Sequence, residues 1–398
     1  MEQIPASASC TPTKSNPSEV AAVRAEWKER LPNWLQPLLT WLMGFPYSGQ
    51  EPIFPDKPWW ISVVIPTFVL TSGVTMAMAI VNHGGIAWAA IPIAWLLIVN
   101  AARTFQVHVC HQGIHGNFSG NQTVDRAAVE VVSTVLMVQG YDEYHDGHDD
   151  IHHPKLASDE DPDLKFTVNV MKIKPGNPES VNKRKFLLSI VSPRIHALLI
   201  ISRLKSNFVS CPIYRRLMSI AWLAVFITGI VVSGKWVELL YGCLVPVTVL
   251  YHASAMCQFV TEHFWANKRQ SDQSGGGHYL SLLLNRHLGD PLPEKGIAGA
   301  KWLQCWVIWW ARLLFYHMPV RMGILVADLP VHGSHHLDPH DKGWTNAIYS
   351  HHNLAKRPGG HPVEVFGSFG AIFDRVMASF AQPVQEENGT EVAASTSL

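Results

Sequence analysis

Residues 86–115 read IAWAAIPIAWLLIVNAARTFQVHVCHQGIH, an apolar run that ends in three histidines. The apolar part, residues 86–102, is long enough to span a membrane. His108, His111 and His115 follow at offsets of three and four residues, which puts them on one face of a helical extension of the span. Neutral imidazole is the commonest metal ligand among protein side chains. The stretch therefore predicts a membrane helix that carries metal ligands at its end.

Two further histidine clusters repeat this pattern far along the chain. The stretch HDGHDDIHH carries His145, His148, His152 and His153, and the stretch HGSHH carries His332, His335 and His336. A single histidine, His263, directly follows another long apolar run. One metal ion takes about four to six ligands, and these clusters together with His263 offer more than that. The surplus predicts two metal ions held at the surface of a membrane.

The composition is that of a membrane protein. The chain has 398 residues, of which 47% are hydrophobic and only 16% charged, whereas soluble proteins carry about 25% charged residues. The formal net charge is zero, so no nucleic-acid partner is predicted. The six cysteines form no CxxC pair, which argues against a disulfide framework and against a thiolate zinc site.

Four apolar runs are able to span a bilayer, namely residues 60–81, 86–102, 217–232 and 237–260. Short turns join the first run to the second and the third to the fourth, which predicts two hairpins with both turns on one side. The N-terminus and residues 103–216 and 261–398 then share the other side, which carries a long series of lysines and arginines. By the positive-inside rule that side is cytoplasmic. We therefore expect an all-α integral membrane protein with multiple spans, whose cytoplasmic helical cap holds a His-rich di-metal site and both termini.

Two other apolar segments, residues 127–138 and 302–318, are expected to pack in or against the membrane surface. The first is too short to span, and the second contains Arg312 and four tryptophans. Residues 27–42 have an apolar stripe typical of an interfacial helix, although Pro32 and Pro37 must break or kink it. The expected division is a polar tail with an interfacial segment (1–57), a membrane domain (58–375) and a C-terminal polar tail (376–398).

Several carboxylates adjoin the predicted ligands. Metal-bound histidines usually donate their second N–H to such a partner. Asp149, Asp150 and Glu262 are the strongest candidates for this role because each is next to or near a cluster histidine. A carboxylate that binds a metal directly stays an open alternative.

The arrangement resembles the membrane fatty acid desaturase superfamily, the integral-membrane histidine-box di-iron enzymes, over roughly residues 58–375. The three boxes are His111-Gln-Gly-Ile-His115, His148-Asp-Asp-Ile-His152-His153 and His332-Gly-Ser-His335-His336, and His263 matches the extra histidine after the fourth span. The resemblance implies that these nine histidines bind two iron ions, and that no catalytic side chain is needed beyond the metal ligands. His108 and His145 lie outside the strict boxes and are reserve candidates.

The resemblance further implies an oxidoreductase that uses Fe2+/Fe3+ and O2 to introduce a double bond into a fatty acyl or lipid chain. No haem or flavin motif is visible, so the electrons are expected from an external donor of the ferredoxin, rubredoxin or cytochrome b5 type with its reductase. The second box has three intervening residues rather than two, and the short first box looks less like the acyl-CoA desaturases of animals than like bacterial and plant lipid desaturases. The substrate carrier therefore stays open.

Three alternatives remain at this point. A hydroxylase or monooxygenase of the same superfamily would act on a lipid, alkane or terpenoid with the same metal site. A membrane zinc hydrolase needs about three histidines and a water, which leaves most of these histidines unexplained. A metal transporter would place polar ligands at mid-membrane depth, whereas the predicted spans contain almost none.

Overall fold

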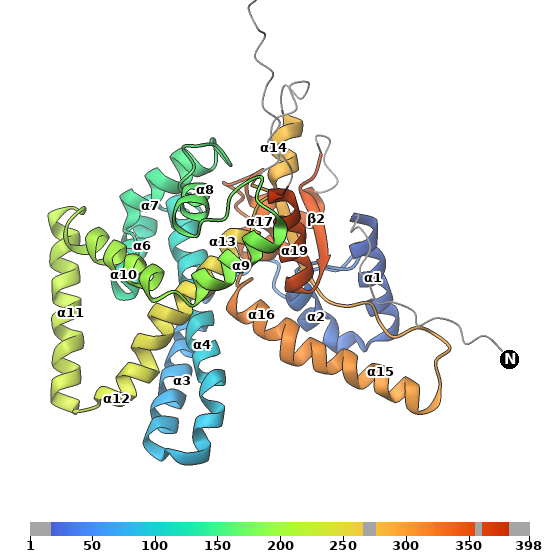
Figure 1. The fold of residues 1–398 in the computed structure, drawn as a ribbon, viewed down its shortest axis with the longest axis horizontal. Coiled ribbons are helices and arrows are strands. Elements are labelled where there is room, and N and C mark those ends of the chain that lie inside the picture. The colour runs from blue at the N-terminus through green and yellow to red at the C-terminus, as the bar shows by residue number, and fades with distance from the viewer. Residues whose placement is uncertain (1–16, 266–275, 355–359, 382–398) are drawn as a thin grey trace, which may run out of the picture.

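The computed structural model describes residues 17–265, 276–354 and 360–381, so residues 1–16 of the predicted N-terminal part and residues 382–398 of the predicted C-terminal tail lie outside the described residues. The regular structure is mostly helical (Figure 1), which confirms the predicted fold class in its coarse form. Among the described residues, the exception to an all-α fold is one small two-stranded sheet.

Four helices of the described chain are long and apolar enough to cross a membrane. They are α3 (Ile61–His83), the continuous helix Gly85–Ile114 that includes α4 (Ile91–Thr104) and α5 (Gln112–Ile114), α11 (Ile213–Ser233), and the continuous helix Trp236–Thr261 that includes α12 (Trp236–Leu239) and α13 (Tyr251–Thr261). Each predicted span matches one of them. Large apolar side chains such as Val64 and Phe68 are exposed along them, as expected for helices that face lipid.

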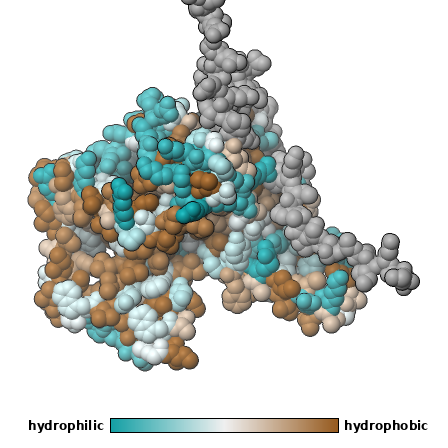
Figure 2. All heavy atoms as spheres, in the orientation of Figure 1, coloured by the Kyte–Doolittle hydropathy of each residue, from teal (hydrophilic) through white to brown (hydrophobic). Residues whose placement is uncertain are grey.

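The spans are joined at one end of the molecule. Helices α3 and α4 run side by side and meet at the bottom of Figure 1, where the chain also passes from α11 to α12. Ala77 and Ala94 are fully buried between the first two spans, which lets the two backbones approach closely. The remaining elements gather toward the other end and to one side, and hydrophilic residues collect there (Figure 2).

Shorter helices make up that other part of the molecule. Before the second box lie α1 (Pro17–Arg30), α2 (Gln36–Met43), α6 (Gln122–Leu136) and α7 (Tyr141–Gly147). After it come α8 (Pro162–Lys165), α9 (Glu179–Ile190), α10 (Pro193–Phe208) and α14 (Gly276–Leu282). The last are α15 (Gly299–Arg312), α16 (Met318–Gly323), α17 (His332–His335), α18 (Ala347–Leu354) and α19 (Phe369–Phe380).

The predicted interfacial stripe packs mainly against protein. The chain breaks between α1 and α2, as Pro32 and Pro37 indicated, and Trp27 and Leu42 are fully buried in the largest core. Trp34, in the short turn between the two helices, is 78% exposed. Helix α15 runs crosswise to the spans in Figure 1 and exposes part of its apolar face. At the other end of the chain, α19 stays buried to Phe380, so the packed chain continues beyond residue 375.

The sheet pairs β1 (Leu284–Leu288) with β2 (Val363–Gly367) in parallel, with Leu284 opposite Val363. All five residues of β1 are buried, although three of them, Asn285, Arg286 and His287, are polar. Their side chains are hydrogen-bonded inside the protein, so the strand is stable without the alternating apolar pattern by which strands are predicted from sequence.

Candidate metal centre

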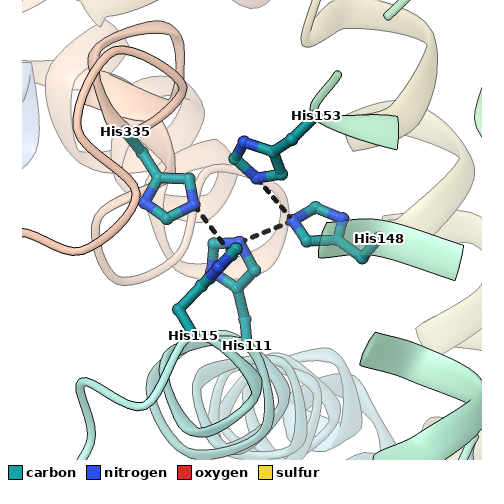
Figure 3. Close-up of side chains that lie close together, drawn as sticks. All are labelled: His111, His115, His148, His153 and His335. Carbon is teal, nitrogen blue, oxygen red and sulfur yellow. Dashed lines mark hydrogen bonds between the residues drawn. The ribbon is translucent and has the colours of Figure 1, made fainter. Parts of the chain in front are cut away.

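Five histidines from three separate elements converge in a first group. They are His111, His115, His148, His153 and His335, and one ring nitrogen of each lies within 4.8 Å of the others. The Nε2 atom of His148 is 2.9 Å from that of His111 and 3.1 Å from that of His153. Figure 3 shows these rings pointing toward one another from α4 and its extension, from the turn after α7, and from α17. The group therefore presents several imidazole nitrogens to one point.

Four further histidines form a second group, in which one ring nitrogen of each also lies within 4.8 Å of the others. They are His152, His263, His332 and His336, and all four are buried. The Nε2 atoms of His332 and His336 are 3.2 Å apart. Neither ring nitrogen of His263 has a hydrogen-bond partner among the described residues, although the side chain is fully buried. An unpaired buried imidazole is costly, and a metal ion at this point would satisfy it.

The two groups adjoin each other. Ring nitrogens of His148 and His152 and a carboxylate oxygen of Asp163 also lie within 4.8 Å of one another. His111 stands with its ring centroid 6.0 Å from that of His332. The nine predicted histidines are thus divided five and four between neighbouring sites, which is an arrangement that could bind two metal ions.

A local backbone feature accommodates the three residues between His148 and His152 in the second box. Residues His148–His152 form a π-helical turn, and the backbone N–H of His153 donates to the carbonyl of His148, five residues earlier. His148 and His153 consequently reach the first group together, while His152 turns to the second. In a regular α-helix the residues three and four apart would share a face instead.

Another π-helical segment, Phe105–His111, lies within the second span and ends at the first residue of the first box. His111 belongs to the first histidine group, but His108 does not join either group. The His108 ring packs against Trp344, with centroids 5.4 Å apart. His145 also stays outside both groups and lies beside Asp146 and Asp150 near the surface.

Carboxylates and a tyrosine contact the outer ring nitrogens. Asp149 Oδ1 lies 3.0 Å from His115 Nδ1, and the Tyr279 hydroxyl lies 3.2 Å from His336 Nδ1. Glu262 is buried, and its Oε2 is 3.9 Å from His332 Nε2. The side chain of Asp150 is 62% exposed and lies beside His145, which belongs to neither group. Of the three candidate carboxylates, Asp149 and Glu262 therefore lie at the centre and Asp150 does not.

Two carboxylates after the second box were not chosen from the sequence. Asp161 is fully buried with Oδ1 3.0 Å from His152 Nδ1, and Asp163 Oδ2 is 3.6 Å from the same nitrogen. Such partners fix the orientation of a metal-binding imidazole. The signal that could have pointed to them is the Asp161-Pro-Asp163 sequence, which follows the box closely and combines two acids with a helix-initiating proline.

The electrostatics of the centre favour neutral imidazoles at most positions. Burial, together with repulsion from neighbouring histidines, holds the pKa values of His332, His335 and His336 well below their ordinary value. His152 differs, because burial lowers its pKa but the hydrogen bond to Asp161 and the charge of Asp163 raise it to about 9. Metal binding requires the neutral ring, so His152 would release its proton when a metal binds.

Strand β1 is hydrogen-bonded to the third box and to the end of α13. The Asn285 amide donates to Ser334 Oγ at 3.0 Å, and Ser334 N donates back to Asn285 Oδ1 at 3.2 Å. Arg286 donates to the carbonyls of Gln258 (3.3 Å) and Leu329 (2.8 Å). These contacts tie the third box to the end of α13, which leads to His263. Sequence reasoning missed this role, and its signal is the polar Asn-Arg-His run inside an otherwise apolar stretch.

A cavity of about 150 Å³ reaches both histidine groups. His111, His148 and His332 line it together with apolar Val107, Phe259 and Leu329 and with polar side chains such as Asp163, Gln258 and Glu262. The cavity is therefore a space of mixed polarity beside the candidate metal positions.

Comparison with known proteins agrees with the geometry. The model of the fatty acid desaturase family matches residues 86–357, which is more than half of the chain and includes all nine histidines of the two groups. No curated protein matches the chain in sequence. The resemblance based on the histidine boxes is confirmed by the family match. The chain belongs to the fatty acid desaturase family, a family of oxidoreductases.

Proposed function

We propose that this protein is an O2-dependent di-iron desaturase that introduces a double bond into a fatty acyl or lipid chain. One observation carries the proposal: nine buried or half-buried histidines form adjoining groups of five and four at the end of helices apolar enough to span a membrane. A single catalytic zinc would use about three of them. Imidazole suits iron, zinc, copper and nickel alike, so the family supplies the choice of iron.

In this proposal, each histidine group holds one iron ion. The metal ligands are His111, His115, His148, His153 and His335 for one site and His152, His263, His332 and His336 for the other. Asp149, Asp161 and Tyr279 hold three of the rings from their outer nitrogens. When bound, the two irons would supply the oxidising power toward an unactivated C–H bond that no protein side chain has.

The chain's own residues position the substrate. The cavity beside His111, His148 and His332 is lined by apolar Val107, Phe259 and Leu329 and by polar side chains such as Asp163, Gln258 and Glu262, and in this proposal an alkyl segment lies against the apolar residues. The overall reaction removes two hydrogens from neighbouring methylene carbons and reduces one O2 to two waters. The balance needs two electrons and two protons, which an external donor of the ferredoxin, rubredoxin or cytochrome b5 type with its reductase would deliver with solvent protons.

The proposed orientation places the metal centre in the cytoplasm. The α3–α4 and α11–α12 connections lie together at the end away from the histidines (Figure 1). Basic residues between the second and third spans, such as Lys183 and Arg184, lie on the histidine side and support this orientation by the positive-inside rule. The protein would be an integral membrane protein whose described parts outside the spans face the cytoplasm, except for the two connections at the opposite end.

The first test is the metal content of the detergent-purified protein after expression in iron-supplemented medium. We expect about two irons per chain, and loss of iron in a His148→Ala, His335→Ala double variant. His83→Ala is the matched control, because His83 is exposed at the opposite end of the spans and should not affect iron content. One zinc and no iron in the wild-type protein would refute the di-iron proposal.

Product analysis tests the reaction itself. The lipids of cells that express the protein should contain additional unsaturated acyl chains, and the double variant should abolish them. Hydroxylated lipids without new double bonds would instead identify a hydroxylase with the same metal centre.

A further inference from the structure

A second and larger cavity, of about 460 Å³, lies next to the metal centre. The start of α3 forms an apolar wall with Ile61, Ile65 and Val69, and Lys57, Ser62 and Asp328 contribute charged or polar groups. Val107 and Leu329 line the cavity at the histidines, while their sequence neighbours His108 and Asp328 line this one. The two cavities therefore border the same two segments of the chain.

Two buried polar atoms of this cavity lack a partner among the described residues. Ser62 is 3% exposed and its Oγ makes no hydrogen bond there. Asp328 is 9% exposed; its Oδ2 accepts from the Gln112 amide at 2.9 Å, but its Oδ1 has no donor. Buried polar atoms are nearly always paired in native proteins. Two such atoms on one cavity indicate that a ligand supplies the missing hydrogen bonds.

Lys57 adds a positive charge to the same space. Its ammonium group donates one hydrogen bond within the described chain, to the Thr345 carbonyl at 3.3 Å. An ammonium group has three N–H donors, so it can donate further bonds to a ligand. The buried Asp328 carboxylate is near enough for the two charges to influence each other. Together they are close to electrically neutral.

The apolar wall continues onto the lipid-facing side of the first span. Ile65 is 57% exposed, and its neighbour Val64 is 54% exposed, on a helix apolar enough to cross a membrane. Lys57 precedes that helix and therefore lies at the level expected for lipid head groups. A ligand whose polar head lies at Lys57 would thus have its hydrocarbon chain along α3.

We propose that this cavity binds the head of a neutral, hydroxyl-bearing membrane lipid with a single chain, of the fatty alcohol or monoacylglycerol class. Lys57 can only donate and Asp328 Oδ1 accepts, so the head must both accept and donate a hydrogen bond, as a hydroxyl group does. A carboxylate head would accept from Lys57 but would be repelled by Asp328. The apolar wall accommodates the first part of the chain, and binding does not require a metal.

The test is photo-crosslinking of metal-free protein in detergent micelles at neutral pH. The probe is a long-chain fatty alcohol with a diazirine in its chain, and the matching fatty acid is the comparison probe. We expect the alcohol to label residues 61–69, unlabelled monoacylglycerol to compete, and the fatty acid to label several-fold less. Lys57→Met should reduce labelling by about tenfold, as expected for loss of a hydrogen bond to a charged group.

Matched variants keep the result interpretable. Lys235→Met is the control, since Lys235 is a half-exposed lysine at the far end of the spans, and it should label like wild type. Ser62→Ala removes only the hydroxyl and should weaken labelling less than Lys57→Met. Asp328→Asn leaves Lys57 uncancelled, so the preference should move toward the fatty acid.

Three results would overturn the proposal. They are equal labelling of Lys57→Met and wild type, labelling spread evenly along all spans, and no labelling of residues 61–69 in protein with a normal unfolding temperature. Because the experiment uses metal-free protein, its failure is separate from failure of the desaturase proposal, which the iron and product measurements report.

Discussion

Replacing Gly333 by alanine should displace the third histidine box. Gly333 lies between His332 and Ser334 in α17, and this helix packs directly on the backbone of β1. A Cβ atom on Gly333 would lie 2.7 Å from the nitrogen and 2.9 Å from the carbonyl carbon of Leu284. These are backbone atoms, so no side chain can rotate away to make room.

The size of the displacement follows from these distances. Ordinary contacts of a Cβ atom begin at 3.4 Å, so the helix and the strand must separate by roughly 3.4 − 2.7 = 0.7 Å. Metal–ligand distances tolerate changes of only about 0.2 Å. Helix α17 contributes His335 to the first group and His332 to the second. Both proposed metal sites should therefore be distorted, at an overpacking cost of about 1–3 kcal/mol in the free energy of unfolding.

The assay is iron content together with the unfolding temperature and desaturation activity of purified Gly333→Ala protein. We expect loss of most of the iron and at least about a hundredfold lower activity, since a misplacement near 1 Å can cost that much. Gly229→Ala is the matched control. Gly229 lies inside the helix α11, away from the histidines, and no atom lies within 4 Å of the position that an alanine Cβ would take. Unchanged iron and activity in Gly333→Ala would refute the reasoning.

Three further outcomes are expected. Asp161→Asn should weaken iron binding by about 10–100-fold, measured by chelator competition, because the carboxylate no longer holds His152 Nδ1; equal affinity would contradict this role. Asn285→Ala removes the hydrogen bonds to Ser334 and should destabilise the protein by about 2 kcal/mol, measured by thermal unfolding. Metal analysis should also show a lower iron content. A variant with wild-type stability and iron content would show that strand β1 does not hold the third box in place. Burial raises the pKa of Asp328 from 3.8 to about 6, so the folded state favours the protonated acid and wild-type stability falls as pH rises from about 4 to 6. The free energy of unfolding of Asp328→Asn, taken relative to wild type, should therefore rise by up to about 3 kcal/mol across that pH range and stay constant above it. A difference that does not change with pH would contradict the raised pKa of Asp328.

The spans and the histidines could be read from the sequence because both depend on local patterns. A run of apolar residues such as 86–102 has few alternatives to a membrane helix, and helical spacing alone indicated that His111 and His115 face the same way. The family match covers the residues of all three boxes. The division of the nine histidines into five and four required the structure, because it depends on the π-helical turn at His148.

The strand pair and the larger cavity beside α3 were not predictable from local patterns. Strand β1 reads Leu-Asn-Arg-His-Leu, which has no two-residue alternation, and Asn285 meets Glu364 across a sequence separation of 79 residues. Lys57 and Asp328 likewise come from distant parts of the chain. Such sites depend on tertiary packing, and a single sequence gives no indication of which distant polar residues will meet.

The parallel pairing of β1 with β2 also sets an order of events during synthesis. The first two boxes leave the ribosome well before β1, and β1 itself must wait for β2 to be made before the strand behind α17 is complete. Until then the early imidazoles have no fixed partners on the late part of the chain. In the proposed di-iron enzyme, metal loading would consequently follow the synthesis of all four spans, because the complete ligand set exists only after the late part of the chain has folded.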